Sequence, residues 1–361
     1  MSSEIKFGQQ LSLMQAALLI AHSPENRYML EGEPGIGKSS LITLIAEIIG
    51  KLRNVTYNTA YMDVPNMDLG DIAMPVINHE ERTTGYYPNR RFKLHEGKPV
   101  VIMLDEFTKG VEAIKNMLHP LLEVSNPRLG DLPIPLESII FMTGNLTSDM
   151  VGDSLKAHTL NRIIPIQVRK PDDVEWLGWA VNNNIEPVVM SWVDQYPHAL
   201  ASYTTGDQES NPYIYNPKKQ QKAFVSPRSL ERASNIIRQR HQLDSDTVIC
   251  SLTGAIGESG SRDMQAYIDY EDQLPKWKDI LDDPKKVLVP DSAGACAVMV
   301  FGAINKVTKN SISPFMKYLD RFEPEWQATF AINIAKNPVK QSIAFSSNAF
   351  ADWVQKNEDL L

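Results

Sequence analysis

The stretch Gly32-Glu33-Pro34-Gly35-Ile36-Gly37-Lys38-Ser39 matches the pattern G-x-x-x-x-G-K-[ST] of a phosphate-binding loop. Residues 27–30 precede it with the character of a short strand, and residues 40–49 follow it with the apolar spacing of a helix. Glycines let such a loop curl so that several N–H groups point at one phosphate chain, and the helix N-terminus adds a partial positive charge. A strand, a glycine-rich loop and a helix in this order predict a nucleotide-binding protein rather than a plain glycine-rich turn.

Two residues of this loop have defined expected roles. Lys38 is expected to reach the β- and γ-phosphates of the nucleotide, and the Ser39 hydroxyl to contact Mg²⁺. We expect the whole loop, residues 32–39, and Ser40 at the start of the helix to contact the nucleotide. The predicted cofactors are therefore ATP and Mg²⁺.

Composition narrows the class of protein. With 361 residues, 43% of them hydrophobic and 22% charged, the chain is long enough for two domains with substantial cores. The net charge of −8, without a Lys/Arg block, disfavours a general nucleic-acid binder. Cys250 and Cys296 are too far apart in sequence for a zinc or redox motif. Because neither a signal-peptide pattern nor a long apolar run is present, we expect a cytoplasmic protein without a membrane segment.

The apolar pattern changes near residue 170. Before that point, strand-like runs alternate with helical patterns, as in an α/β domain with a parallel sheet. After it, helical patterns dominate. We expect an α/β core at 1–170 with an insertion at about 67–97, a helical lid at 171–258, and a helical C-terminal extension at 259–361. Residues 259–290, acidic and interrupted by prolines, are expected to form a surface linker with one short helix.

Two further strands end in polar side chains. The apolar run at 98–104 ends in Asp105 and Glu106, so both carboxylates are expected at the carboxyl edge of the sheet beside the phosphate loop. Asp105 would hold Mg²⁺ through its water shell, and Glu106 would polarise the water that attacks the γ-phosphate. Asn145 follows the next strand and would orient that water. The alternatives are a solvated acidic strand end and an ordinary turn asparagine.

In this order, the phosphate loop, the Asp-Glu strand end and the Asn strand end resemble the AAA+ ATPases. Within them, the sequence is similar to the MoxR-like and McrB-like branch, which is also called dynein-related. The resemblance covers about residues 5–245 and implies a P-loop AAA+ core followed by an all-helical lid. Asp68-Leu69-Gly70-Asp71 and Gly85-Tyr86-Tyr87 fall where relatives carry an Asp-Leu-Gly segment and an insertion in helix 2.

The resemblance also assigns two arginines. Arg162, in Thr159-Leu160-Asn161-Arg162-Ile163, would be the arginine finger that reaches the nucleotide of a neighbouring subunit. Ile163 stands where the family usually has Phe, and Arg169 is the alternative candidate. Arg228, in Ser226-Pro227-Arg228, would be the sensor-2 residue that touches the γ-phosphate of its own subunit. The resemblance therefore implies a homo-oligomeric ring, with a hexamer as the expected form.

Three functions compete at this stage. The first is a Mg-ATP-hydrolysing ring that remodels or activates a protein partner as a MoxR-like chaperone, with a von Willebrand factor A domain protein as the partner suggested by the resemblance. The second is a McrB-like motor that acts on nucleic acid or in a restriction system and uses GTP. The third is a scaffold that binds nucleotide and barely hydrolyses it. Tyr86 and Tyr87 would grip a polypeptide or pack on their own domain, and Phe7 and Gly8 are weak candidates for adenine contact.

Overall fold

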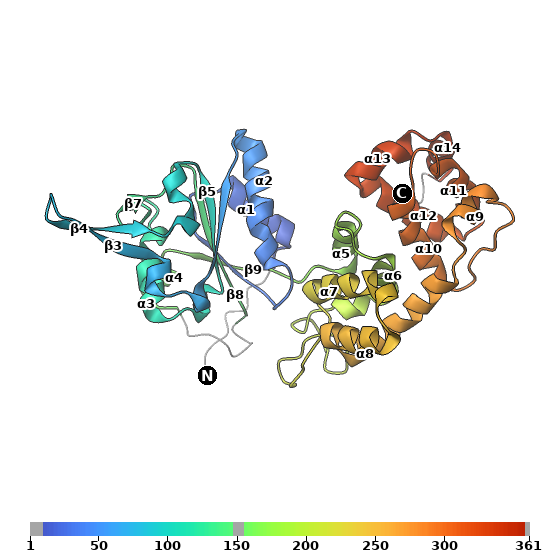
Figure 1. Ribbon diagram of the computed structural model, residues 1–361, viewed down its shortest axis with the longest axis horizontal. Coiled ribbons are helices and arrows are strands. Elements are labelled where there is room, and N and C mark those ends of the chain that lie inside the picture. The colour runs from blue at the N-terminus through green and yellow to red at the C-terminus, as the bar shows by residue number, and fades with distance from the viewer. Residues whose placement is uncertain (1–9, 147–154, 358–361) are drawn as a thin grey trace. The chain divides into compact units, whose positions relative to one another are not determined.

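The computed structural model describes residues 10–146 and 155–357. Phe7 and Gly8, the candidate adenine contacts, lie outside this range. The chain divides into two compact units, Met1–Lys170 and Pro171–Leu361, and Figure 1 shows the α/β character of the first and the helical character of the second.

The first unit contains a sheet of five parallel strands in the order β2-β5-β8-β1-β9. The strands are β1 (Tyr28–Glu31), β2 (Asn58–Asp63), β5 (Val100–Asp105), β8 (Ile139–Gly144) and β9 (Ile164–Gln167). Because all five run in the same direction, their carboxyl ends meet at one edge of the sheet. The register places Asp63 beside Asp105 and Glu31 beside Gly144 at this edge.

Helices cover both faces of this sheet. Val101 and Met103 of β5 belong to the same hydrophobic cluster as helices α1 (Leu13–His22) and α2 (Leu41–Arg53). The alternate residues, Ile102 and Leu104, belong to the cluster that includes helix α3 (Glu112–Leu118). Every residue of β5 and β8 is buried, which explains why both strands read as unbroken apolar runs in the sequence. A short helix, α4 (Ala157–Leu160), precedes β9.

The insertion expected at 67–97 contains an antiparallel hairpin of β3 (Ala73–Asn78) and β4 (Thr83–Pro88). The hairpin projects from the body of the first unit (Figure 1). A second, smaller hairpin, β6 (Arg128–Leu129) and β7 (Leu132–Pro133), contacts it through its turn. Asp131 N donates to Tyr86 O at 2.9 Å, and Asp131 Oδ2 accepts from Tyr86 N at 2.6 Å.

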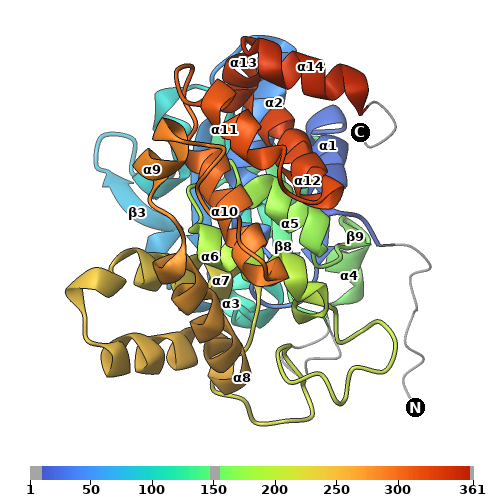
Figure 2. The ribbon, with the colours of Figure 1, turned by 90° about the vertical axis from the view of Figure 1, so that its right-hand side faces the viewer.

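The second unit is built from helices in the part of it that the structure describes. They are α5 (Asp173–Ala180), α6 (Pro187–Gln195), α7 (Pro227–Arg238), α8 (Ser245–Gln273), α9 (Trp277–Asp282), α10 (Ala293–Lys306), α11 (Ile312–Leu319), α12 (Pro324–Lys336), α13 (Pro338–Phe345) and α14 (Asn348–Lys356). Helix α10 packs against α6, α8 and α12 (Figure 2). A single hydrophobic cluster extends from Trp176 on α5 to Trp353 on α14.

The prediction of a surface linker at 259–290 is wrong for residues 259–273, because α8 continues to Gln273. Gly257, at φ 81° and ψ 167°, kinks this helix beside the boundary that the sequence analysis placed at 258. Beyond the kink, Met264, Tyr267 and Ile268 have helical spacing and are buried. The polar residues between them hide this short apolar stripe, and a three-residue stripe is a weak sequence signal.

Candidate nucleotide-binding site

The phosphate loop lies between β1 and α2, at the carboxyl edge of the sheet. It leads into a single 3-10 turn, η1 (Lys38–Ser40), which precedes α2. Gly37 has φ 106°, a conformation that residues with a Cβ rarely adopt, so the loop needs glycine at this position. Ser40 is exposed, and its Oγ donates to Gly37 O at 2.7 Å, which closes the turn at the start of the helix.

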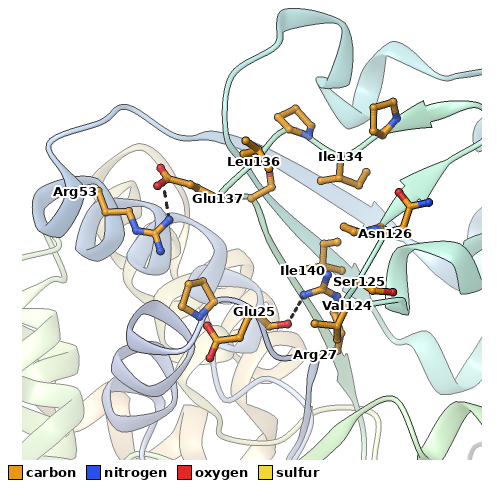
Figure 3. Close-up of a pocket in the computed structure, with 15 residues that line it drawn as sticks. Glu25, Arg27, Arg53, Val124, Ser125, Asn126, Ile134, Leu136, Glu137 and Ile140 are labelled. Carbon is orange, nitrogen blue, oxygen red and sulfur yellow. Dashed lines mark hydrogen bonds and ion pairs between the residues drawn. The ribbon is translucent and has the colours of Figure 1, made fainter.

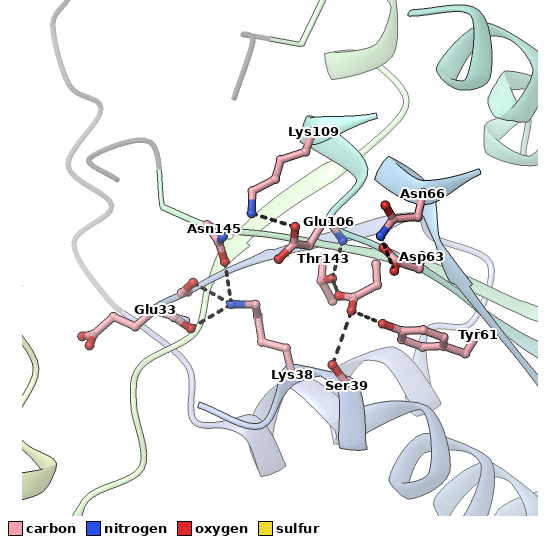
Figure 4. A network of polar contacts seen from close by, with 12 residues as sticks. Glu33, Lys38, Ser39, Tyr61, Asp63, Asn66, Glu106, Lys109, Thr143 and Asn145 are labelled. Atoms are coloured by element: carbon pink, nitrogen blue, oxygen red, sulfur yellow. Dashed lines mark hydrogen bonds and ion pairs between the residues drawn. The ribbon is translucent and has the colours of Figure 1, made fainter. Parts of the chain in front are cut away.

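Lys38 is buried, and its ammonium joins the loop to the end of β8 (Figure 4). Nζ donates to Gly32 O at 2.6 Å, to Glu33 O at 2.9 Å and to Asn145 Oδ1 at 3.4 Å. The structure therefore brings together the loop lysine and the strand-end asparagine that the sequence analysis selected from positions far apart in the chain.

The Asp105 carboxylate is the centre of a hydrogen-bonded network at the same edge, and Figure 4 shows its partners Ser39, Tyr61 and Thr143. Its Oδ2 accepts from Tyr61 Oη at 2.6 Å and from Ser39 Oγ at 3.4 Å. Its Oδ1 accepts from the Thr143 hydroxyl. Tyr61 and Thr143 belong to the two strands that flank β5, and neither was predicted from the sequence. Only the strand order, which local sequence does not contain, reveals that these side chains meet Asp105.

The side-chain oxygens of Ser39 and Asp105 suit a magnesium ion whose other ligands come from the substrate and water. The Ser39 hydroxyl and the Asp105 carboxylate are hard oxygen donors, which Mg²⁺ prefers. Within residues 10–146 and 155–357, no group of three or more His, Cys, Asp or Glu side chains could hold a metal ion. A site with two protein oxygens is what Mg²⁺ needs when phosphates and waters supply its other ligands, so the residues present fit the ion.

Glu106 follows β5 directly and has a left-handed backbone, with φ 51°. Its N–H donates to Thr143 Oγ1 at 3.2 Å. Its carboxylate forms an ion pair with Lys109, with 2.7 Å between Nζ and Oε2 (Figure 4). Lys109 was not among the residues selected from the sequence.

Arg162 precedes β9 and therefore lies at the amino edge of the sheet, whereas the phosphate loop lies at the carboxyl edge. The two edges are separated by the length of a four-residue strand, about 10 Å or more. Arg162 Nε donates to Glu123 Oε1 at 2.8 Å, and Nη1 donates to His158 O at 2.8 Å. The structure does not bring Arg162 to the phosphate loop of its own chain.

His119 lies beside this arginine, and its ring centroid is 5.2 Å from that of His158. Burial lowers the pKa of His119, and the neighbouring Arg162 and His158 lower it further. The surroundings of Arg162 therefore disfavour additional positive charge on His119.

Two cavities open at the amino edge, away from the phosphate loop. One has about 490 Å³ and is lined by residues that include Glu123 and Arg162. The other has about 410 Å³ and is lined by residues that include Arg53 and Glu137 (Figure 3). Both share Arg27, Val124 and Ser125, so they hollow one continuous face of the first unit.

Arg27 anchors this face from within. Its Nε donates to Leu121 O at 3.0 Å, and its Nη1 donates to Glu25 O at 2.9 Å (Figure 3). Burial lowers the pKa of its guanidinium. Since its bonds go to main-chain carbonyls, Arg27 fixes the walls of both cavities and is not free to bind a ligand.

The other two candidate arginines remain predictions. Arg228 is the second residue of α7, whose N-cap Ser226 accepts from Ser229 N at 3.2 Å. The Arg228 side chain is exposed and belongs to the second unit. Arg169, the alternative finger, follows β9, and its Nη1 donates to Lys170 O at 3.4 Å.

A parallel sheet with a phosphate loop after β1, an acidic pair after β5 and an asparagine after β8 defines a P-loop protein of the AAA+ class. Residues 27–134 match the family model of the AAA domain, dynein-related subfamily. This match over residues 27–134 confirms the resemblance to the dynein-related AAA+ ATPases that the sequence motifs predicted.

Comparison with solved structures gives distant matches. NtrX from Brucella abortus in complex with ADP is 13% identical, with 96% of this chain and 67% of that chain covered and a TM-score of 0.39. NtrX in complex with ATP is 12% identical, with 98% and 69% covered and a TM-score of 0.33. No curated protein matches the sequence. In the part of the chain that the structure describes, every helix is too short or too polar to cross a membrane.

Proposed function

We propose that this protein is a Mg-ATP-hydrolysing ATPase that acts as a homo-oligomeric ring, expected to be a hexamer, and remodels or activates a protein partner. One observation carries the hydrolytic part of the proposal. Lys38, Ser39, Asp105, Glu106 and Asn145 converge on one edge of the sheet and are linked there by hydrogen bonds to one another or to shared neighbours.

Each of these groups has a role in phosphoryl transfer. Lys38 would bind the β- and γ-phosphates, while Ser39 and Asp105 would hold Mg²⁺, which neutralises charge on the phosphates when bound. Glu106 would accept a proton from water as the water oxygen bonds to the γ-phosphorus. The bond from that phosphorus to the bridging oxygen breaks, and its electron pair leaves on ADP. Asn145 would orient the water through its side-chain amide.

The position of Arg162 supports a ring. Its Nε and Nη1 are held by Glu123 and His158 O, and Nη2 has no partner within the described ranges. This nitrogen lies at the hollowed amino-edge face, so it could serve a phosphate supplied by a second copy. Val124 and Ile164, which also line that face, are apolar and exposed, as expected of a surface that another subunit covers.

The β3–β4 hairpin supports a protein rather than a nucleic-acid partner. Met74 pairs with Tyr87 on one face of the hairpin, and Pro75 pairs with Tyr86 on the other face. Met74, Tyr86 and Tyr87 are large and exposed to solvent. A two-stranded hairpin with apolar residues on both faces is marginally stable in water, so contact with another apolar surface would stabilise it. The net charge of −8 disfavours a phosphate backbone.

The type of partner is proposed from the family resemblance. MoxR-like relatives suggest a chaperone role and a von Willebrand factor A domain partner. McrB-like relatives suggest the alternative, a GTP-driven motor acting on nucleic acid or in restriction. Sensor 2, assigned to Arg228, would couple the second unit to the nucleotide.

Glu106→Gln tests the proposal. We expect the variant to bind a fluorescent ATP analogue like the wild type and to lose turnover by about 10²–10⁴-fold, since it lacks a proton acceptor. Steady-state hydrolysis of ATP and GTP measures both activity and nucleotide preference. Affinity capture with the ATP-loaded variant would then identify the partner. Unchanged turnover would remove Glu106 from the base role, and a strong preference for GTP would favour the McrB-like alternative.

A further inference from the structure

The side chain that contacts the Glu106 carboxylate is Lys109, three residues further along. Their ion pair, 2.7 Å between Nζ and Oε2, is partly shielded from water, with 24% of the Lys109 side chain and 39% of the Glu106 side chain exposed. The other carboxylate oxygen, Oε1, has no hydrogen-bond partner in the described parts of the chain. One oxygen is thus held by an ammonium, while the other remains able to accept a proton.

The turn that carries Lys109 is fixed by its surroundings. The left-handed backbone of Glu106 starts a 3-10 turn, η6 (Phe107–Lys109), in which Lys109 N donates to Glu106 O at 2.9 Å. Phe107 is buried in the core below the turn. At Gly110 an added Cβ would lie 2.6 Å from Val64 Cγ1, so the chain leaves the turn in close contact with a neighbouring segment. Lys109 therefore starts from an anchored backbone.

Without this contact, the Glu106 side chain would have little to orient it. The bond from Glu106 to Thr143 involves the main-chain N–H of Glu106 and leaves its carboxylate unheld. A glutamate has several rotatable bonds, and a base that moves by about 1 Å can lose about 10²-fold in rate. An ion pair to a lysine on a rigid turn limits that movement.

We propose that Lys109 is a positioning residue for nucleotide hydrolysis, whose ammonium holds Oε2 of Glu106 so that Oε1 faces the attacking water. The assignment rests on the proposed function, because it concerns the same site. The lysine touches neither nucleotide nor water in this scheme and acts through Glu106. It therefore affects the rate of the chemical step and leaves nucleotide affinity unchanged.

The test compares Lys109→Met, Lys109→Arg and a matched control. Lys109→Met keeps the length of the stem and removes the charge, and we expect kcat to fall about tenfold with KM for ATP unchanged. Lys109→Arg should restore most of the rate, because a guanidinium can hold the same oxygen. Lys115→Met is the control, since Lys115 also pairs with a glutamate three residues away, Glu112 at 3.7 Å. It should leave kcat unchanged.

Further measurements separate positioning from folding and from the proposed function. The melting temperature and the affinity for a fluorescent ATP analogue should match the wild type in all variants. In single-turnover experiments on a Glu106→Gln background, Lys109→Met should cause no further loss. An unchanged or increased kcat in Lys109→Met, or no rescue by arginine, would overturn the role of Lys109. A wild-type protein that does not hydrolyse nucleotide would instead overturn the proposed function and the assignment with it.

Discussion

The placement of Arg162 at the amino edge of the sheet leads to a quantitative prediction about mixed rings. A strand of four residues separates that edge from the phosphate loop, so Lys38 and Arg162 of one chain do not meet at the same site. Arg162→Ala alone should reduce turnover by about 10³–10⁵-fold, the usual contribution of an arginine finger. Lys38→Ala alone should abolish nucleotide binding.

Mixing the two inactive variants should restore activity. In a head-to-tail ring, a site is complete when an Arg162→Ala subunit, with its intact Lys38, is followed by a Lys38→Ala subunit with its intact Arg162. Random assembly from equal amounts completes about one quarter of the sites, so we expect about a quarter of wild-type turnover. Recovery should be greatest at equal proportions and fall symmetrically on either side.

Co-expression with two affinity tags, followed by purification on both, ensures that every assembly contains both variants. Steady-state ATP hydrolysis is then measured across expression ratios. Lys93→Ala is the control, because Lys93 forms a surface ion pair with Glu96 at 3.6 Å and lines neither cavity of the amino-edge face; it should keep full activity. Doubly tagged assemblies without activity at any ratio would refute a shared site.

Two further predictions test contacts that the sequence did not reveal. Tyr61→Phe removes the donor to Asp105 Oδ2 and should raise the Mg²⁺ concentration for half-maximal hydrolysis by about tenfold, measured by Mg²⁺ titration; an unchanged midpoint would contradict a role for Tyr61 in orienting Asp105. Asn337→Ala removes the N-cap of α13 and a bond to Val181 O at 3.2 Å, so it should lower the free energy of unfolding in urea by about 2 kcal/mol. Asn333→Ala, which removes a bond from the Asn333 amide to Thr329 O within the same helix, should cost less; equal losses would contradict the Asn337 contact.

Much of the fold was predictable because its signals are local in sequence. The phosphate loop has a fixed spacing, and β5 and β8 are continuous apolar runs because both of their faces are buried. The edge strand β2 was less clear: it was expected at 55–62 and begins at Asn58. Only alternate residues of this strand are buried, so its boundaries leave a weaker apolar pattern.

The residues of the site also include some that the sequence predicts and some that it does not. Asp105, Glu106 and Asn145 were selected because parallel strand ends converge at one edge, a rule that needs no knowledge of strand order. Thr143 and Tyr61 became visible only when β8 and β2 were placed on either side of β5. The contact of Lys109 with Glu106 depends on the left-handed backbone at Glu106, which sequence propensity does not predict for a glutamate.

The continuity of the second unit has a practical consequence for how this chain can be cut. Helix α8 passes from the expected lid into the expected extension, and α6 packs its buried face against α10. A truncated protein that ended at 258 would lack α10 and leave uncovered the part of α6 that packs against it. Such a fragment would aggregate rather than behave as a minimal ATPase. For expression and for crystallisation, residues 171–357 should therefore be kept together.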